Sequence, residues 1–522
     1  MKTLAFLVSI VLLTAAGAAT GQVPNRADAT AKPRCPGENR ILVLGGGGVR
    51  GAYQIGALWY LIHEMKCDFA YYVGTSTGAV SAAYLSQAKS HADLEERIGV
   101  LVADYQGLTD ESQLLHTVPL GSLRVFAPRW LFGVDGVNTL DPLVKKLAAR
   151  LGDAPSNPSN FRAPVVSLQT GNLDAYELDS FLDRVVGSAS IPLAVEPRLT
   201  RVWTTAYIGE IQGDRVELAS NQPPGIADPR CALKLADQAP IRCRHISTHE
   251  RLGENAQVGE NTIVGNGWRM LLEVPDRGEL QRIVDFKKRN WSSPQAVKFT
   301  AVHQLVDGGV TDNLPLGIAL DVSYNEKRFD SIFALTTGES INAADPNAPV
   351  HGGKDILLRS FERLWQTYQE RSLDSYWVGP MAGYFLVDSM EWMQEARAWA
   401  DKLRTTLGEA EFSKLEARMG AAFPKRTPNA LLEPKLLDAL NDKAYPPTIY
   451  LIEPTEKFFT QTFEVAPEKI AKALRHGCRL AANFFDPAAA VERIGNLVRY
   501  DRWLREEVGR SCDRFEASEP RG

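Results

Sequence analysis

Residues 41–56 have the sequence ILVLGGGGVRGAYQIG, and residues 69–85 have the sequence FAYYVGTSTGAVSAAYL. Each stretch begins with an apolar run, continues through a glycine-containing turn, and ends in residues with helical spacing. An apolar run without alternation predicts a strand that is buried on both faces, as in a parallel sheet. Two successive strand–turn–helix units therefore predict an α/β fold.

Four later segments have the same strand-like character: 165–168, 304–306, 332–335 and 448–452. Because helical patterns separate the strand candidates, we expect a central, mostly parallel sheet with helices on its faces. Two long intervals interrupt this alternation, at about 200–295 and 354–445, and we interpret both as insertions into one catalytic domain. Residues 486–522 are expected to form a closing helix followed by a polar tail.

The second turn, Gly74-Thr75-Ser76-Thr77-Gly78, has the pattern G-x-S-x-G between a strand and a helix. A serine in this context lies on a tight turn with its hydroxyl exposed above the sheet. Gly74 and Gly78 remove side chains that would collide with the bent backbone. Ser76 is therefore the candidate nucleophile, whereas the pattern outside this context would be only a glycine-rich turn.

The first turn carries four consecutive glycines, Gly45 to Gly48, followed by Val49, Arg50 and Gly51. Bare backbone amides of Gly46, Gly47 and Gly48 are suited to stabilise the oxyanion formed during acyl transfer. The same residues fit the phosphate-binding pattern G-x-G-x-x-G. However, no Lys-Ser/Thr pair follows, and no acidic residue lies at the distance that a dinucleotide site requires. Arg50 is expected to anchor the loop by hydrogen bonds, with substrate contact as the alternative.

A third turn, Asp307-Gly308-Gly309, follows the strand candidate 304–306. A carboxylate at the carboxyl end of a strand lies at the edge where α/β sheets place their active sites. Considered alone, Asp-Gly-Gly is most often a plain turn.

Taken in order, these turns resemble the motifs of the patatin-like phospholipase family. The family shows a G-G-G-x-[RK]-G loop, a G-x-S-x-G turn, a small-residue stretch ending in proline, and a D-G-[GA] turn. The matching segments here are 46–51, 74–78, 187–192 and 307–309. The resemblance covers about residues 39–485 and implies a three-layer α/β/α domain.

That resemblance also implies a chemistry without a cofactor or a metal. Ser76 would attack the ester carbonyl of a lipid or phospholipid, and Asp307 would accept the serine proton. Supporting positions carried over from the motifs are Arg50, Gly51, Gly74, Gly78, Gly308 and Gly309.

Two other interpretations stay open on the sequence. A Ser-His-Asp esterase would need a histidine base, and His303, His351 and His476 are the candidates. Alternatively, the chain is a catalytically inactive lipid-binding protein of the same fold. A further stretch rich in aromatic residues, 365–399, is compatible with a lid, with a peripheral membrane contact or with ordinary helix core.

The first residues resemble an export signal. Lys2 precedes an apolar run at 4–13, and Ala16-Gly17-Ala18 provides small residues for cleavage, so we expect a signal peptide over 1–18 and a linker over 19–38. A secreted or periplasmic location follows from this interpretation. The net charge of −5 argues against nucleic acid as a partner.

Six cysteines in an exported chain predict disulfides rather than free thiols. Fifteen pairings are possible for six cysteines. Proximity in the chain favours Cys231–Cys243 and Cys478–Cys512, which leaves Cys35–Cys67. The spacing matches no zinc motif.

Overall fold

The computed structural model describes residues 34–117, 138–152, 158–171, 177–178, 180–192, 194–221, 225–236, 238–246, 250–252, 256–257, 263–264, 267–290, 295–323, 329–337, 405, 447–459, 463–485, 491–494, 497–500 and 510–515. The expected signal peptide, most of the expected linker and the insertion at 354–445 lie outside the described residues.

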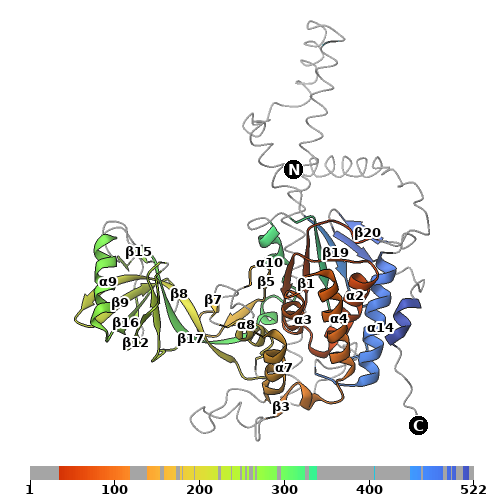
Figure 1. Ribbon diagram of the computed structural model, residues 1–522, viewed down its shortest axis with the longest axis horizontal. Helices are drawn as coiled ribbons and strands as arrows, with labels where there is room; N and C mark the ends of the chain where they lie inside the picture. The colour runs from red at the N-terminus through yellow and green to blue at the C-terminus, as the bar shows by residue number, and fades with distance from the viewer. Residues whose placement is uncertain are drawn as a thin grey trace, which may run out of the picture.

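The centre of the molecule is a seven-stranded sheet with the order β20-β21-β19-β18-β1-β2-β5 (Figure 1). Strands β1 (Arg40–Leu44), β2 (Tyr71–Gly74), β18 (Ser331–Leu335) and β19 (Thr448–Ile452) form its middle. All pairings among these four and with β5 (Phe161–Arg162) are parallel. These parallel pairings confirm the prediction of a mostly parallel sheet.

Helices cover both faces of this sheet and give three layers. Leu42 and Leu44 belong to a large core with α2 (Ala52–His63), α3 (Thr77–Leu85), α4 (His91–Gln106) and α14 (Pro467–Phe484). Ile41 and Val43 face the opposite way, into a core that includes residues of α10 (Leu316–Asp321). Successive residues of β1 therefore serve different layers, as the geometry of a strand requires.

The region predicted as the first insertion forms a separate antiparallel sheet (Figure 1). Its longest strands are β8 (Arg198–Gln212) and β17 (Val297–Asp307), which pair antiparallel over nine residue pairs. The sheet continues through β9 (Arg215–Ser220) and β16 (Trp268–Glu273), and α9 (Arg277–Arg289) packs on it. We call residues 198–307 the β lobe; it begins and ends slightly outside the expected 200–295.

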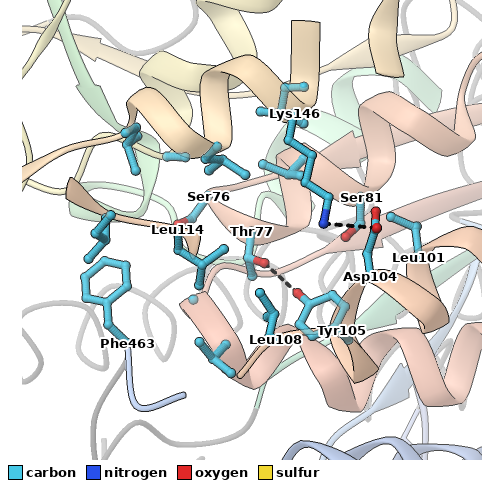
Figure 2. Close-up of a pocket in the computed structure, with 18 of the residues that line it drawn as sticks. Ser76, Thr77, Ser81, Leu101, Asp104, Tyr105, Leu108, Leu114, Lys146 and Phe463 are labelled. Atoms are coloured by element: carbon cyan, nitrogen blue, oxygen red, sulfur yellow. Dashed lines mark hydrogen bonds and ion pairs between the residues drawn. The ribbon is translucent and has the colours of Figure 1, made fainter. Parts of the chain in front are cut away.

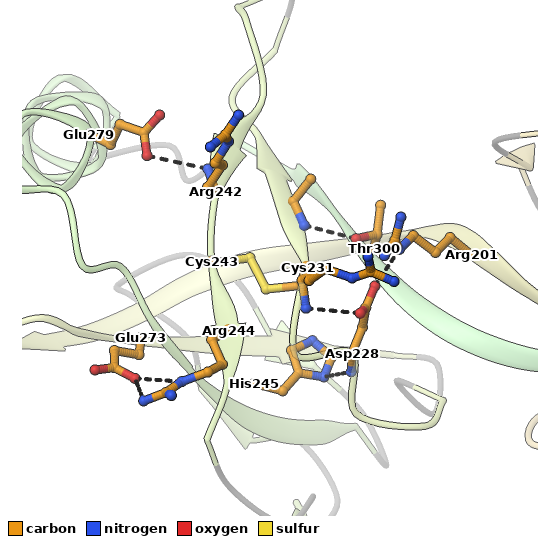
Figure 3. The surroundings of a disulfide bond; sticks show 12 residues. Arg201, Asp228, Cys231, Arg242, Cys243, Arg244, His245, Glu273, Glu279 and Thr300 are labelled. Carbon is orange, nitrogen blue, oxygen red and sulfur yellow. Dashed lines mark hydrogen bonds and ion pairs between the residues drawn. A yellow bond between two sulfur atoms is a disulfide. The ribbon is translucent and has the colours of Figure 1, made fainter.

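The β lobe carries a disulfide, Cys231–Cys243, between β10 (Ala232–Lys234) and β11 (Ile241–Arg242) (Figure 3). Next to it, buried Asp228 accepts a hydrogen bond from Arg201 Nε at 2.5 Å. The other two disulfides, Cys35–Cys67 and Cys478–Cys512, belong to the parallel-sheet body. The two pairs favoured by chain proximity and the remaining pair, Cys35–Cys67, are all present, and they suit an oxidising environment.

Two expectations from the sequence are wrong. The segment 304–306 is not part of the parallel sheet, because β17 pairs antiparallel with β8 and with β6 (Val165–Ser167). The end of the chain does not continue as a helix either. Residues 491–494 and 497–500 form strands β20 and β21, and β21 pairs parallel with β19. An open sheet edge overrode the local helical pattern there.

None of the described helices combines the length and the hydrophobicity needed to cross a bilayer.

Candidate active site

Ser76 lies on a sharp turn between β2 and α3, as the G-x-S-x-G pattern predicts. Its backbone has φ 55° and ψ −123°, a left-handed conformation that costs a non-glycine residue about 1–3 kcal/mol. A Cβ on Gly74 would lie 2.3 Å from the carbonyl oxygen of Gly78, and a Cβ on Gly78 would lie 2.3 Å from that of Leu44. Both flanking glycines are therefore required for the turn that presents the serine.

Asp307 reaches the same place from the β lobe. It is the last residue of β17, and it is 1% exposed. Its Oδ1 accepts a hydrogen bond from the amide of Gly309 at 2.7 Å. A Cβ on Gly308 would lie 2.3 Å from the carbonyl oxygen of Pro164, so this turn also depends on glycine.

Burial raises the pKa of Asp307 to about 7, while hydrogen bonding to Ser76 and to the amide of Gly309 lowers it. The carboxyl group is therefore poised to hold or release a proton near neutral pH. Oδ2 is buried and makes no well-aligned hydrogen bond to any described residue. Because Ser76 is the hydrogen-bonding neighbour of this carboxyl group, Oδ2 is the candidate acceptor of the Ser76 proton.

The backbone amides of the glycine loop differ in whether they already have a hydrogen-bond acceptor. The amide of Gly46 donates to the carbonyl oxygen of Asn313 at 2.9 Å, so the prediction of Gly46 as an oxyanion donor is wrong. The amides of Gly47 and Gly48 donate to no described backbone acceptor. Gly48 has φ 59° and lines the same pocket as Ser76. The candidate donor set is thus Gly47 and Gly48.

Arg50 is buried and supports this loop. Its Nε donates to the carbonyl oxygen of Gly47 at 3.1 Å, and its own amide donates to the same oxygen at 3.3 Å. These bonds agree with an anchoring role for Arg50. On the other side of the loop, Thr337 Oγ1 donates to the carbonyl oxygen of Gly46 at 2.6 Å.

The small-residue stretch 187–192 joins the two catalytic candidates. The amide of Ser76 donates to Ser188 Oγ at 3.2 Å, and the amide of Asp307 donates to the carbonyl oxygen of Ser190 at 2.9 Å. The sequence placed this stretch in a motif but gave it no role. Its positioning function needs the tertiary structure, because residues 76, 188 and 307 are far apart in the chain.

A pocket of about 980 Å³, including the part open to solvent, begins at Ser76. Figure 2 shows Ser76 between Phe463 and an ion pair of Asp104 with Lys146. Most of the wall is aliphatic, with contributions from Val49, Val80, Leu101, Leu108, Leu114, Leu115, Leu140, Leu143, Leu147 and Ile191. Such a wall suits an extended hydrocarbon chain next to the nucleophile.

The histidines that sequence analysis considered as bases lie elsewhere. His303 Nδ1 is hydrogen-bonded to Ser167 Oγ at 2.8 Å, and His476 Nε2 accepts from the amide of Thr455 at 3.1 Å. Among the described histidines, none lines the pocket at Ser76. His351 lies outside the described residues.

A scan against family models matches residues 42–203 to Patatin-like phospholipase. The matched range contains the glycine loop, the serine turn and the stretch 187–192, and it ends before Asp307. No curated protein matches the chain. The parallel sheet with helices on both faces agrees with the fold that the resemblance implies. Over residues 42–203, the chain is therefore similar to the patatin-like phospholipase family.

Proposed function

We propose that this protein hydrolyses acyl esters of lipids through a Ser76–Asp307 dyad. The observation that carries the proposal is the convergence of three features at one point. Ser76 is held in a left-handed turn, a buried carboxyl group with a pKa of about 7 faces it, and an aliphatic pocket begins beside it.

The reaction begins with Asp307 ionised. Its Oδ2 takes the proton of the Ser76 hydroxyl as Oγ attacks the ester carbonyl carbon. The amides of Gly47 and Gly48 stabilise the tetrahedral oxyanion, aided by the positive end of α3. Asp307 returns the proton to the leaving alcohol, and a water molecule then releases the fatty acid from Ser76 by the same route.

A histidine-based esterase is the second candidate, and no observation in the described part of the chain favours it. An inactive lipid-binding protein would have no need for the strained backbone conformation of Ser76, because such strain clusters at functional sites. Export to an oxidising compartment, secreted or periplasmic, is part of the proposal and is supported by the three disulfides.

The decisive experiment measures hydrolysis of p-nitrophenyl octanoate and of phosphatidylcholine vesicles by the full chain. We expect Ser76→Ala and Asp307→Asn each to lower kcat/KM by about three orders of magnitude or more. A fluorophosphonate probe should label wild type and not Ser76→Ala. Arg244→Ala, in an exposed ion pair of the β lobe, is the matched control that keeps full activity. An active Asp307→Asn variant would contradict the dyad.

For the wild-type enzyme, kcat/KM should rise about ten-fold per pH unit below the pKa of about 7 and level off above it. The sign follows from the need for ionised Asp307 as the base.

A further inference from the structure

The pocket at Ser76 extends along one face of helix α3. The residues of the α3 segment that line it are Ser76, Thr77, Val80, Ser81 and Tyr84, which recur at helical spacing on one stripe. With a rise of about 1.5 Å per residue, the stripe from Ser76 to Tyr84 is about 12 Å long. The pocket therefore has a measurable length that starts at the nucleophile.

Two more helices form its walls with stripes of the same kind. Helix α4 contributes Leu101, Asp104 and Tyr105, and α7 (Asp141–Leu151) contributes Leu143, Lys146, Leu147 and Arg150. The hydroxyls of Thr77 and Tyr105 are hydrogen-bonded at 2.9 Å near the nucleophile. The guanidinium of Arg97, earlier in α4, lies over the ring of Tyr84 at 4.9 Å. Helix α4 thus runs antiparallel to α3 along the pocket.

Away from Ser76, the character of the wall changes. Asp104 Oδ1 is paired with Lys146 Nζ at 3.0 Å and with Arg150 Nη2 at 2.9 Å, so the two cations of α7 that line the pocket are both tied to α4. The Arg150 guanidinium also lies 5.8 Å from the ring centroid of Tyr84. We call these two ion pairs the Asp104 bridge. Figure 2 shows the Asp104–Lys146 pair on the Ser81 side of the pocket, opposite Phe463.

We propose that the Asp104 bridge limits the length of the acyl chain and makes this protein selective for medium-chain acyl esters. The inference rests on the proposed function and names the substrate class of that same site. An extended chain advances about 1.25 Å per methylene, given a C–C bond of about 1.52 Å and an angle of about 111°. Arg150 of the bridge lies beside the ring of Tyr84, about 12 Å from Ser76 along α3, and this length holds about nine or ten carbons.

Longer chains gain nothing from their additional carbons. Up to the bridge, each methylene leaves water for an aliphatic wall and should raise kcat/KM about four-fold. Beyond it, the chain end meets two cations and a carboxylate, which would have to lose hydration or separate to admit it. The profile of kcat/KM against chain length should therefore rise and then break at about C10.

The experiment is a series of p-nitrophenyl esters from C4 to C16, assayed with the full chain at fixed cosolvent. The double variant Lys146→Met/Arg150→Met keeps the aliphatic length of both side chains and removes their charge. It should move the break at least two carbons upward. Ser81→Leu narrows the pocket about 7.5 Å from Ser76 along α3 and should move the break down to about C6.

Arg244→Ala is again the control, because it breaks an ion pair in the β lobe, away from the pocket. A second measurement does not need turnover. Fatty acids of C6 to C16 titrated into Ser76→Ala by calorimetry should show Kd falling about four-fold per carbon and levelling at the same break.

The outcomes separate the two claims. An active wild type without a break, or with a break that the Lys146→Met/Arg150→Met variant leaves in place, overturns the length limit and keeps the hydrolase. A folded wild type that neither turns over any ester nor reacts with a fluorophosphonate removes the proposed function and this inference with it. If Ser81→Leu does not fold, the double variant and the calorimetric series still decide.

Discussion

The parallel-sheet body and the β lobe bury their apolar side chains in different ways. In the body, residues 41–44 of β1 form an uninterrupted apolar run, and alternate residues of this run enter two separate cores. In the β lobe, buried and accessible residues alternate along much of β8, and the largest core of the lobe forms between the sheet and α9. Parallel sheets are covered on both faces, whereas antiparallel sheets can leave one face to water.

The catalytic candidates divide along the same line. The body supplies Ser76 and the glycine loop, and the strand that ends the β lobe supplies Asp307. The stretch 187–192, which precedes the lobe, bonds to both residues. The last strand of the β lobe therefore carries the acid/base candidate of a site whose other members belong to the body. The following predictions test how far the two regions are independent, from the largest effect to the smallest.

The largest effect is expected where the two regions meet, at Asp307. Its pKa is about 7 in the folded protein, against an ordinary value of 3.8, so the folded state favours the protonated form. The stabilisation is complete below pH 3.8 and is lost as the pH rises to about 7, a difference of about 4 kcal/mol. The free energy of unfolding of Asp307→Asn, measured relative to that of wild type, should thus rise by up to about 4 kcal/mol between pH 4 and pH 8.

Urea unfolding at the two pH values measures this difference. Asp183→Asn is a useful comparison, because Asp183 is paired with Arg198 in the lobe junction and its loss should destabilise the protein instead. A constant difference between wild type and Asp307→Asn across this pH range would mean that Asp307 titrates at its ordinary pKa.

The next effect concerns the body alone, where α2 and α14 cross at glycines. A Cβ on Gly477 would lie 1.9 Å from the carbonyl oxygen of Tyr53, and backbone atoms cannot move aside as a side chain can. Gly477→Ala should lower the free energy of unfolding by about 3 kcal/mol or more. Gly99→Ala is the matched control. Gly99 lies in helix α4 with open space around it, so alanine should stabilise by about 0.5–1 kcal/mol.

Chemical denaturation followed by circular dichroism measures both variants. Equal stability of Gly477→Ala and wild type would show that the helices do not approach as closely as described. Loss of the β lobe signal at the same denaturant concentration as the body would show one cooperative unit rather than two.

The smallest effect is expected in the β lobe. Replacing Cys231 and Cys243 together by serine opens a short loop, with a sequence separation of 12, and should cost about 2–3 kcal/mol. Hydrogen exchange should accelerate in β10, β11 and β16 and stay unchanged in β1 and β2. Replacing Cys35 and Cys67 together by serine should instead accelerate hydrogen exchange in β1 and β2 and leave it unchanged in β10, β11 and β16. Acceleration in β1 after loss of Cys231–Cys243 would contradict separate stability.

Much of the body was predictable from local pattern. The apolar runs at 41–44 and 332–335 specified central strands because a strand buried on both faces has no polar alternation. The serine turn was equally clear, since two glycines and a strand–helix context leave few other conformations for Ser76. The strand pairing at 491–500 was missed because a sheet edge, and not local propensity, selected it.

Local sequence is enough to predict the α/β class, the serine turn, the glycine loop and the favoured disulfide partners, because each depends on residues close together in the chain. The tertiary structure places Asp307 at the end of an antiparallel strand, and it brings the amide of Gly46 into a hydrogen bond with the carbonyl oxygen of Asn313. It also decided that burial raises the pKa of Asp307 and that three helices align their stripes into a pocket of limited length. These properties depend on desolvation and on contacts between distant segments, which no local pattern encodes.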